Sequence, residues 1–336
     1  MSIEIKSYSD EFVKSHEEFS LKVWPSKKRR RIEKYIRWKF RGNETGDVNG
    51  LLLAIEKNKV VGQLGLIPVK FKHRSEIYNA QWACDLMVDP ELRKTGIGNK
   101  LFTEALSRDM VSLGNNPSPR AEKVMLSIGF KPVQSGRTMV FPLNVKHLMN
   151  WALPEKIKFA IPVAGRMIQP YYSLKKNSLL KIKSDFEIAE WKNLNELITR
   201  RQESDDYTGI VHDIEFMSWR VEGLENFTPN IKTIKNKEGS YALHSEFKPY
   251  YQVYDWYCKD NSELKKMLSE ITAAAIKTEA QTIQIVANSH EEEIQLGKAG
   301  FIKSRNIERI IYYSKKLSID SKAKFYFTLY DTDLNL

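Results

Sequence analysis

The chain has 336 residues, of which 42% are hydrophobic and 28% are charged; this composition excludes a mainly disordered protein, and the length favours two domains of about 150 residues. The 53 Lys and Arg residues outnumber the 42 Asp and Glu residues and leave a net charge of +11. This surplus favours anionic partners such as phosphates, nucleic acid or a membrane surface, without choosing among them.

The first half of the chain predicts alternating helices and strands. Apolar periodicity predicts helices at 11–21, 30–40, 98–110 and 120–127, and strands at 3–7, 51–56, 60–70, 78–88, 110–113, 131–133 and 138–141. A hairpin turn is expected at Lys57-Asn58-Lys59, and the polar segment 115–119 is a helix-capping signal. We expect the last two of these strands to close the first domain.

The rest of the chain predicts a connector and a second domain. Residues 144–178 carry Pro154, Pro162 and Pro170 and are expected to form a mainly helical connector. Beyond it, the pattern predicts helices at 193–203, 214–221, 263–276 and 291–298, and strands at 182–189, 231–234, 240–245, 250–258, 282–287, 302–303, 308–313 and 325–330.

Similar segments recur in the same order in both halves. Tyr35-Ile-Arg-Trp38-Lys-Phe40 is matched by Phe216-Met-Ser-Trp219-Arg-Val221, 181 residues later. Three further pairs follow at spacings of 178, 170 and 171 residues: Lys57-Asn-Lys59 with Lys235-Asn-Lys237, Ala83-Cys-Asp-Leu86 with Val253-Tyr-Asp-Trp256, and Gly129-Phe130 with Gly300-Phe301. The repetition predicts a duplicated domain, with a first copy at 1–143, a connector at 144–178 and a second copy at 179–336.

No secretory or membrane-spanning segment is predicted. The N-terminus lacks the order of a signal peptide, and the most apolar stretch, 159–167, is far shorter than the ~20 residues that cross a bilayer. Two cysteines, Cys84 and Cys258, are too few for a disulfide framework and indicate a reducing compartment. We therefore expect a soluble, cytoplasmic protein.

The most informative motif is Val88-Asp-Pro90-Glu-Leu-Arg93-Lys-Thr-Gly96-Ile-Gly98, which joins an apolar strand to an amphipathic helix. Gly96 and Gly98 carry no side chain that would block a ligand, so successive backbone N–H groups can turn towards one anion at the helix N-terminus. A P-loop is absent, and a dinucleotide fingerprint would need a third glycine where Leu101 stands. The alternative is a glycine-rich turn that only connects strand and helix.

This motif resembles the central motif of the GNAT superfamily of acyl-CoA-dependent N-acyltransferases, in which a strand ending in V-x-P precedes [QR]-x-x-G-x-[GA] and a helix. Gly129-Phe130 resembles the end of the next family motif. The resemblance implies an α/β fold with two GNAT-like domains, each a mixed, mostly antiparallel sheet flanked by helices. It also implies acetyl-CoA, or another acyl-CoA, as co-substrate.

The resemblance assigns the donor site by position. Backbone groups of Leu86, Met87 and Val88 would pair with the pantetheine arm of CoA, and the strands at 78–88 and 110–113 would part to admit the thioester. The pyrophosphate would be held by the loop and the first helical turn, which comprise Arg93, Lys94, Thr95, Gly96, Ile97, Gly98, Asn99 and Lys100.

The catalytic residues follow the family pattern less closely. Met125 stands where many relatives have a Tyr that protonates the leaving thiolate, and Cys84 stands where several have a His or Glu base. Asp85 is the nearest carboxylate and is a candidate base or ammonium anchor, although strand alternation points it away from Cys84 unless a bulge intervenes. The alternatives are a core role for Cys84 and a structural hydrogen-bond role for Asp85. Trp38 and Trp82 are candidates for the substrate-pocket wall or for the core.

The second copy has no equivalent of the phosphate loop. At a spacing of 170 residues, Gly96 and Gly98 correspond to Lys266 and Leu268, in a plain amphipathic helix start. We therefore expect the second copy to be degenerate, to leave CoA binding to the first copy, and to help shape the acceptor site.

These observations predict an acyl-CoA-dependent N-acyltransferase that acts on a primary amine, either a small molecule or a carbohydrate-borne amine such as an amino sugar. Trp38-Lys39, the Asp85 strand and the closing Leu329-Tyr-Asp331-Thr-Asp333 further resemble tandem GNAT proteins of bacterial polysaccharide and amino-sugar modification. A non-catalytic or regulatory CoA-binding module remains the alternative, and aminoacyl or fatty-acyl transfer from a carrier is a third possibility.

Other partners find less support in the sequence. The basic run Lys27-Lys-Arg-Arg-Arg31 could contact an anion, but no nucleic-acid signature accompanies it. The six histidines are unclustered, which argues against a metal site. The oligomeric state does not follow from the sequence.

Overall fold

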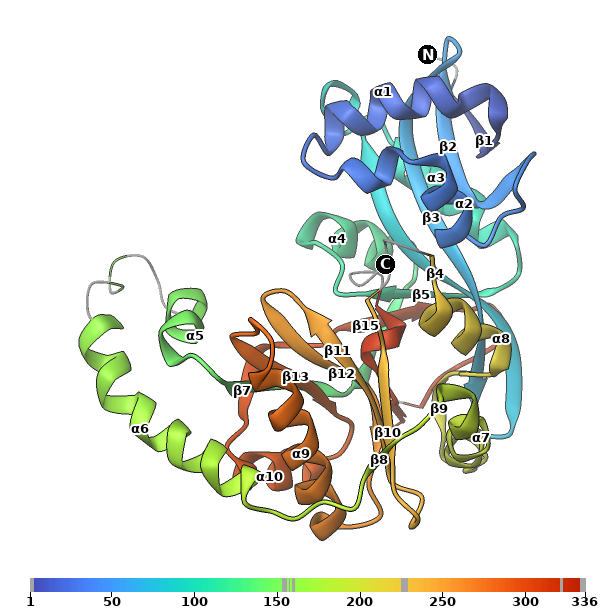
Figure 1. The fold of residues 1–336 in the computed structure, drawn as a ribbon. Helices are drawn as coiled ribbons and strands as arrows, with labels where there is room; N and C mark the ends of the chain where they lie inside the picture. The colour runs from blue at the N-terminus through green and yellow to red at the C-terminus, as the bar shows by residue number, and fades with distance from the viewer. Residues whose placement is uncertain are drawn as a thin grey trace.

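Two sheets with helices on their faces form the body of the molecule (Figure 1). The computed structural model describes residues 3–152, 156, 158, 161–224, 229–320 and 323–332. The helices of the described chain are α1 (Val13–Val23), α2 (Glu33–Lys39), α3 (Ile97–Ser107), α4 (Pro119–Ser127), α5 (Val145–Ala152), α6 (Ile161–Leu180), α7 (Asn195–Gln202), α8 (Ile214–Met217), α9 (Asn261–Ile276) and α10 (His290–Ala299).

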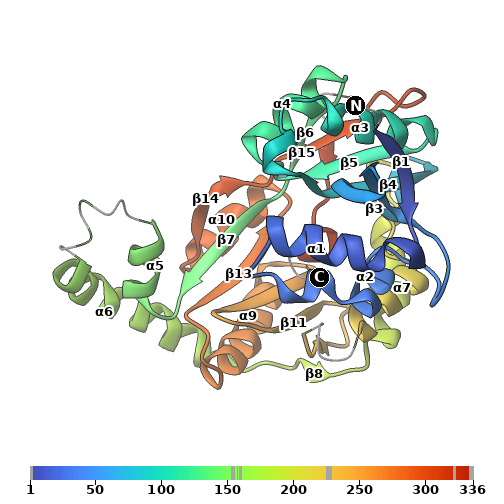
Figure 2. The same cartoon turned by 90° about the horizontal axis from the view of Figure 1, so that it is seen from above.

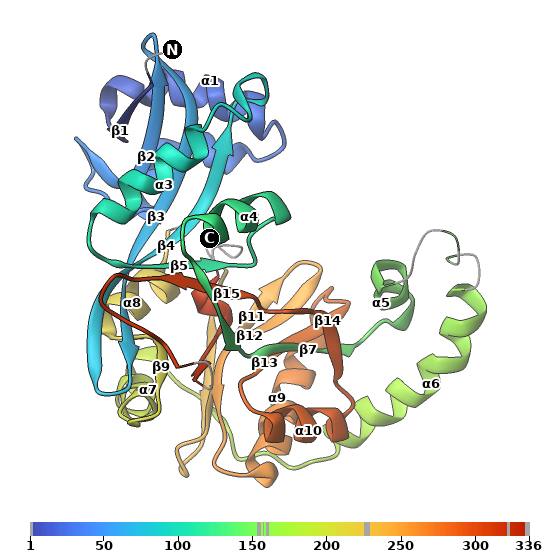
Figure 3. The ribbon, with the colours of Figure 1, turned by 180° about the vertical axis from the view of Figure 1, so that it is seen from behind.

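The first sheet has the strand order β1-β2-β3-β4-β5-β15-β6-β16, with β9 paired to β3. Its strands are β1 (Glu4–Tyr8), β2 (Val48–Glu56), β3 (Lys59–His73), β4 (Glu76–Val88), β5 (Val111–Asn115), β6 (Lys131–Ser135), β9 (Thr208–Ile210), β15 (Ile310–Tyr313) and β16 (Lys324–Phe325). Helices α1 and α2 cover one face and α3 and α4 the other, as Figures 1 and 3 show from opposite sides.

The second sheet has the order β14-β7-β13-β12-β11-β10-β8. Its strands are β7 (Arg137–Pro142), β8 (Glu187–Ile188), β10 (Lys232–Lys235), β11 (Tyr241–Phe247), β12 (Tyr250–Tyr257), β13 (Thr282–Ala287) and β14 (Ile302–Ile307). Apolar side chains of α9 and α10 pack on this sheet and form a separate core with it. Both sheets mix antiparallel and parallel pairs, which confirms the predicted mixed α/β fold.

The two halves of the chain exchange one strand each. β7 pairs antiparallel with β13 and β14 of the second sheet. In return, β15 lies between β5 and β6 of the first sheet. The prediction that the strand at 138–141 closes the first domain is therefore wrong. Met139 and Phe141 of β7 are buried in the second core, and local periodicity carries no information about which sheet a strand joins.

Two other expectations fail near the C-terminus and after the connector. Of the predicted strand 325–330, only Phe325 lies in a strand, β16, because Thr328 and Asp331 cap each other and turn the chain at Leu329–Asp331. The strand predicted at 182–189 shrinks to Glu187–Ile188. The connector is helical over α5 and α6, with Pro170 inside α6. Within the described ranges, no helix is both long and apolar enough to cross a membrane.

The strand exchange predicts that the halves fold together. A fragment of residues 1–143 would lack β15 between β5 and β6 and would expose Met139 and Phe141 to water. We expect this fragment to show no cooperative thermal unfolding by circular dichroism, and co-expression with residues 144–336 to restore it. A cooperative transition of the 1–143 fragment alone would contradict the prediction.

Candidate active site

The N-terminus of α3 is open to solvent and positively charged. Gly96 occupies the N-cap position with φ +84°, a left-handed conformation that glycine adopts without strain, and no side chain caps this helix. A Cβ added at Gly96 or Gly98 would meet no atom within 4 Å. The surrounding Arg93, Lys94 and Lys100 are exposed. The unpaired N–H groups of the first turn and these three cations together form an anion site.

Strand β4 carries a bulge at Asp85. Gly65 of β3 pairs with Cys84 and Gln63 pairs with Met87, so Asp85 and Leu86 oppose the single residue Leu64. Asp85 adopts a positive φ of 52°. A bulge is therefore present at Asp85. It turns the Asp85 side chain into the protein, so that this side chain does not follow the alternation of the strand.

The Asp85 carboxylate is buried and bonded to two cations. Lys39 Nζ donates to Oδ2 at 2.8 Å, and Arg30 forms an ion pair with Oδ1. The Lys39 side chain is only 1% exposed. Burial alone would raise the pKa of Asp85, but Lys39 and Arg30 hold this pKa below its usual value. The carboxylate is thus a poor proton acceptor and a strong anchor for the bulge.

Beyond this point β4 separates from β5. The two strands pair only at Ala80–Trp82 and Val111–Leu113. Where they part, a cavity of about 390 Å³ opens between the end of β4, the turn after β5 and α4. The predicted parting of these strands is confirmed.

Both halves of the chain line this cavity. The first half contributes the segment 83–87, Trp82 and the turn 114–118, and the second half contributes Phe216, Trp219, Arg220, Tyr330, Asp331 and Thr332. Three lining residues carry buried polar atoms with no hydrogen-bond partner in the described structure: Trp82 Nε1, Asn115 Oδ1 and Tyr330 Oη. Such atoms are costly unless a ligand or water satisfies them, so the lining suits a partly polar ligand.

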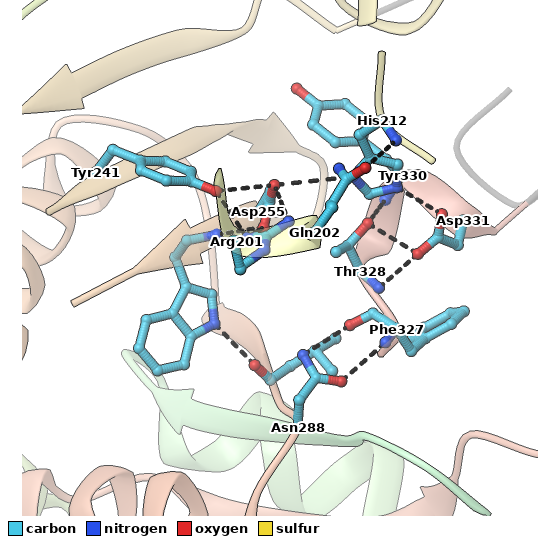
Figure 4. A network of polar contacts seen from close by, with 12 residues as sticks. Arg201, Gln202, His212, Tyr241, Asp255, Asn288, Phe327, Thr328, Tyr330 and Asp331 are labelled. Atoms are coloured by element: carbon cyan, nitrogen blue, oxygen red, sulfur yellow. Dashed lines mark hydrogen bonds and ion pairs between the residues drawn. The ribbon is translucent and has the colours of Figure 1, made fainter. Parts of the chain in front are cut away.

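Asp331 is held by a buried polar network that Figure 4 shows. Its Oδ1 accepts a hydrogen bond from His212 Nε2 at 2.8 Å, and its Oδ2 accepts from the backbone N–H and the hydroxyl of Thr328 at 2.8 and 3.1 Å. Asp255 lies on the other side of His212, with 3.9 Å between His212 Nδ1 and Asp255 Oδ2. Arg201 binds Asp255 through two hydrogen bonds of 2.7 and 3.0 Å.

This network favours a charged His212. Burial alone would lower the pKa of His212, but Asp331 and Asp255 outweigh burial and raise the pKa to about 9. The imidazolium therefore faces Asp331 at neutral pH and fixes the orientation of that carboxylate at the cavity wall.

Some of the residues predicted for catalysis, for the donor site and for the substrate pocket lie together at the cavity. Cys84, Leu86, Met87 and Trp82 line the cavity. Val88 lies one residue further along β4, paired with Gly62. Trp38 is not among the lining residues that the structure describes. It lies behind Trp219, whose Nε1 donates to the Trp38 carbonyl oxygen at 3.1 Å.

Sequence reasoning missed Asp331, His212 and Arg220 as site residues. Asp331 stands in a closing motif that was noted only for its resemblance, and Asp333 of that motif lies outside the described residues. Arg220 follows Trp219 in the repeated motif, as Lys39 follows Trp38. Only tertiary contact shows that the C-terminal segment reaches the first sheet. The parts of the chain that the structure covers contain no cluster of metal-ligating side chains.

In the second sheet, protein side chains occupy the places that correspond to the N-terminus of α3 and to the cavity of the first sheet. The N-terminus of α9 is capped by Asp260, which accepts from the N–H groups of Ser262 and Glu263. Leu268 is fully buried in the core. Where β12 leaves β13, Trp256 Nε1 donates to the Val286 carbonyl oxygen at 2.8 Å, and Asn288 binds the backbone of Phe327. The carboxylates of Asp260 and Glu263 at the start of α9 disfavour the binding of an anion there.

Comparison with known proteins agrees with this geometry. Residues 4–111 match the family model described as Acetyltransferase (GNAT) domain. The comparison with curated protein sequences finds no match.

Solved structures share the fold over nearly the whole chain. A GCN5-related N-acetyltransferase from Kribbella flavida is similar with a TM-score of 0.63 and 10% identity, covering 93% of this chain and 70% of that one. One from Anabaena variabilis gives 0.61 and 12%, over 93% and 72%. The N-myristoyltransferase of Saccharomyces cerevisiae with bound myristoyl-CoA gives 0.57 and 14%, over 93% and 82%.

Replacement of Gly98 by Val tests the anion site. The added side chain meets no protein atom, so we expect Gly98→Val to leave the melting temperature nearly unchanged. It would occupy the space in front of the helix N–H groups and weaken CoA binding at least about tenfold, as measured by isothermal titration calorimetry. Gly297→Val in α10, where a Cβ also meets nothing within 4 Å, is the matched control and should bind CoA normally. Equal affinity of both variants would disprove the site.

The raised pKa of His212 predicts a pH-dependent stability. Since this pKa rises from 6.5 to about 9 on folding, its contribution is complete below about pH 6.5 and disappears as the pH rises through 9. We expect the free energy of unfolding in urea to fall by a few kcal/mol across this window. His212→Gln should flatten that part of the profile, whereas substitution of the exposed His290 by Gln should not. A wild-type profile that stays level between pH 6.5 and 9 would refute the assignment.

Proposed function

We propose that this protein is an acyl-CoA-dependent N-acyltransferase that transfers an acyl group, acetyl in the simplest case, to a primary amine. The observation that carries the proposal is the uncapped, cationic N-terminus of α3 beside the cavity that opens where β4 leaves β5. The N-terminus of α3 suits a pyrophosphate, and the cavity suits a thioester. The GNAT match over residues 4–111 supports the same assignment.

The donor would lie along the free edge of β4. Its pyrophosphate would accept hydrogen bonds from the N–H groups of the first turn of α3, with Arg93, Lys94 and Lys100 balancing its charge. The amides of its pantetheine arm would pair with the backbone of Leu86–Val88, which β5 leaves unpaired. A backbone N–H at the bulge would then polarise the thioester carbonyl.

Asp331 is the carboxylate best placed for the acceptor. An ionised carboxylate has about four lone-pair sites, and its three hydrogen bonds leave one for a ligand in the cavity. We assign to Asp331 the binding of the acceptor ammonium and the removal of its proton, since one cation, His212, contacts Asp331 where two cations contact Asp85. The neutral amine then attacks the thioester carbon and the C–S bond breaks. The CoA thiolate leaves and takes the second proton, which the nitrogen loses as the amide forms. Asp85 would instead hold the bulge through Lys39 and Arg30.

The cavity wall supports an acceptor with a flat apolar face. Trp82, Phe216, Trp219 and Tyr330 contribute aromatic rings from both halves of the chain. Rings of this kind stack on sugar faces and on other planar groups, which supports an amino sugar or another small-molecule amine as acceptor. A cytoplasmic location is part of the same proposal, since Cys84 and Cys258 are both in the thiol form.

We also propose that the chain is a tandem of two GNAT-like domains, 1–143 and 179–336, joined by the connector 144–178. Support comes from matched ion pairs in the two sheets: Arg30 with Asp85 and Arg201 with Asp255. Each aspartate sits at a bulge, since His244 pairs with Val253 and Leu243 with Asp255 in the second sheet. The second copy would be degenerate as a donor site and would supply Asp331 to the first.

Release of free thiol from acetyl-CoA in the presence of a panel of amino sugars and simple amines tests the activity. We expect turnover with at least one amine, and Asp331→Asn to lower kcat/KM at least about 100-fold with CoA affinity unchanged, because the base is lost. Asp213→Asn changes a half-buried helix N-cap outside the cavity, and the Asn amide oxygen can still accept from the Phe216 N–H. This variant is the matched control and should keep its activity.

The alternative function is a CoA-binding module without catalysis. Met125 favours it, because this residue is buried beside the cavity where a proton donor is expected and has no proton to give. Tight CoA binding with no thiol release from any amine in the panel would select this alternative. Full activity of Asp331→Asn would remove Asp331 from the mechanism and leave the donor site intact.

A further inference from the structure

The connector between the two halves concentrates the positive charge of the protein. Residues 144–178 contain six Lys and Arg residues and a single acidic residue, Glu155. This segment of 35 residues therefore accounts for five of the eleven net positive charges. Figures 1 and 2 show that its helices α5 and α6 project from the body as an arm.

One side of α6 packs against the protein. Ile161, Gly165 and Leu179 are buried, and Tyr172 contacts Phe141 of β7 edge-on, with 6.0 Å between the ring centroids. Lys175 Nζ donates to the Lys298 carbonyl oxygen at 3.0 Å. The helix is thus held in place by the second sheet and its helices.

The other side of α6 presents a stripe of apolar side chains to solvent. Val163, Met167, Tyr171 and Leu174 are 66%, 76%, 52% and 70% exposed. Their spacing of four, four and three residues places them on one face of the helix. Single exposed apolar residues are common, but four in a row on one helix face mark an interaction surface.

A cationic groove borders this stripe. Between α5 and α6 lies an open groove of about 600 Å³, lined by Lys146, Arg166, Gln169 and Pro170 among others. Lys146 and Arg166 come from different helices and face the same groove. The surface therefore combines an apolar stripe with a pair of cations at its side, which is the pattern of helices that lie in a membrane interface.

We propose that α5 and α6 dock this protein on the surface of an anionic lipid bilayer. The apolar stripe of α6 would enter the boundary between headgroups and acyl chains, and Lys146 and Arg166 would bind lipid phosphates. A second copy of this chain fits less well, because the same basic segment would face itself and repel. The proposal does not depend on acyl transfer.

Sedimentation with lipid vesicles tests the docking. We expect the intact chain to bind vesicles of phosphatidylcholine with about one-third phosphatidylglycerol, to bind pure phosphatidylcholine at least about tenfold more weakly, and to dissociate at high salt. Met167→Asp with Leu174→Asp should weaken binding to the anionic vesicles at least about tenfold. Ile77→Asp, at an exposed apolar position on β4, is the matched control and should bind as the wild type does.

Charge reversal tests the groove separately. Lys146→Glu with Arg166→Glu should weaken binding at least about tenfold, whereas Lys57→Glu with Lys59→Glu, an equal change of charge in the β2–β3 turn, should not. CoA affinity should stay unchanged in every variant, which separates this proposal from the donor site.

Three results would overturn the docking. They are no binding of the wild type to anionic vesicles, equal binding of the α6 variants and their controls, and a wild-type dimer by light scattering that the α6 substitutions convert to a monomer. The last result would identify a second copy as the occupant of the stripe.

Discussion

The candidate site depends on one buried ion cluster, in which Lys39 and Arg30 hold the Asp85 carboxylate at the bulge of β4. The bulge changes the course of the strand just where its pairing with β5 ends, so a free backbone edge and a cavity arise together. A carboxylate with so little contact with water is tolerated only because two cations neutralise it. The same neutralisation makes Asp85 unsuited to proton transfer, a role that we propose for Asp331 instead.

That residue comes from the other end of the chain because the halves exchange strands. β15 joins the first sheet and β7 joins the second, so the C-terminal segment after β15 runs back between the two sheets. In this segment, the backbone of Phe327 is bound by Asn288, and mutual capping between Thr328 and Asp331 stabilises the turn at Leu329–Asp331. His212, Asp255 and Arg201 then fix the Asp331 carboxylate against the cavity. The site is therefore composite, and the second half contributes chemistry as well as support.

The contrast between α3 and α9 shows how similar frameworks acquire different ligand preferences. Both helices follow a strand that carries a bulge with a buried aspartate. Gly96 leaves the N–H groups of α3 open among cations, whereas Asp260 and Glu263 place carboxylates at the start of α9. The difference lies in a few side chains at one helix end. The two helices lie on different sheets, each after a bulged strand, so side chains at the helix start account for the difference in local charge.

Local patterns in the sequence were sufficient for most helices and strands and for the glycine loop at Gly96 and Gly98, whereas the place where β4 and β5 part was implied by the family resemblance. The helices, the strands and the glycine loop depend on residues near one another in the chain, through periodicity, capping and the freedom of glycine. The partner strands of β7 and β15, the pairing of Asp85 with Lys39 and Arg30, and the position of Asp331 depend on contacts between distant segments. Only tertiary packing decides these, because a strand of a given pattern fits either sheet and a carboxylate acquires its role from the cations and histidine that surround it.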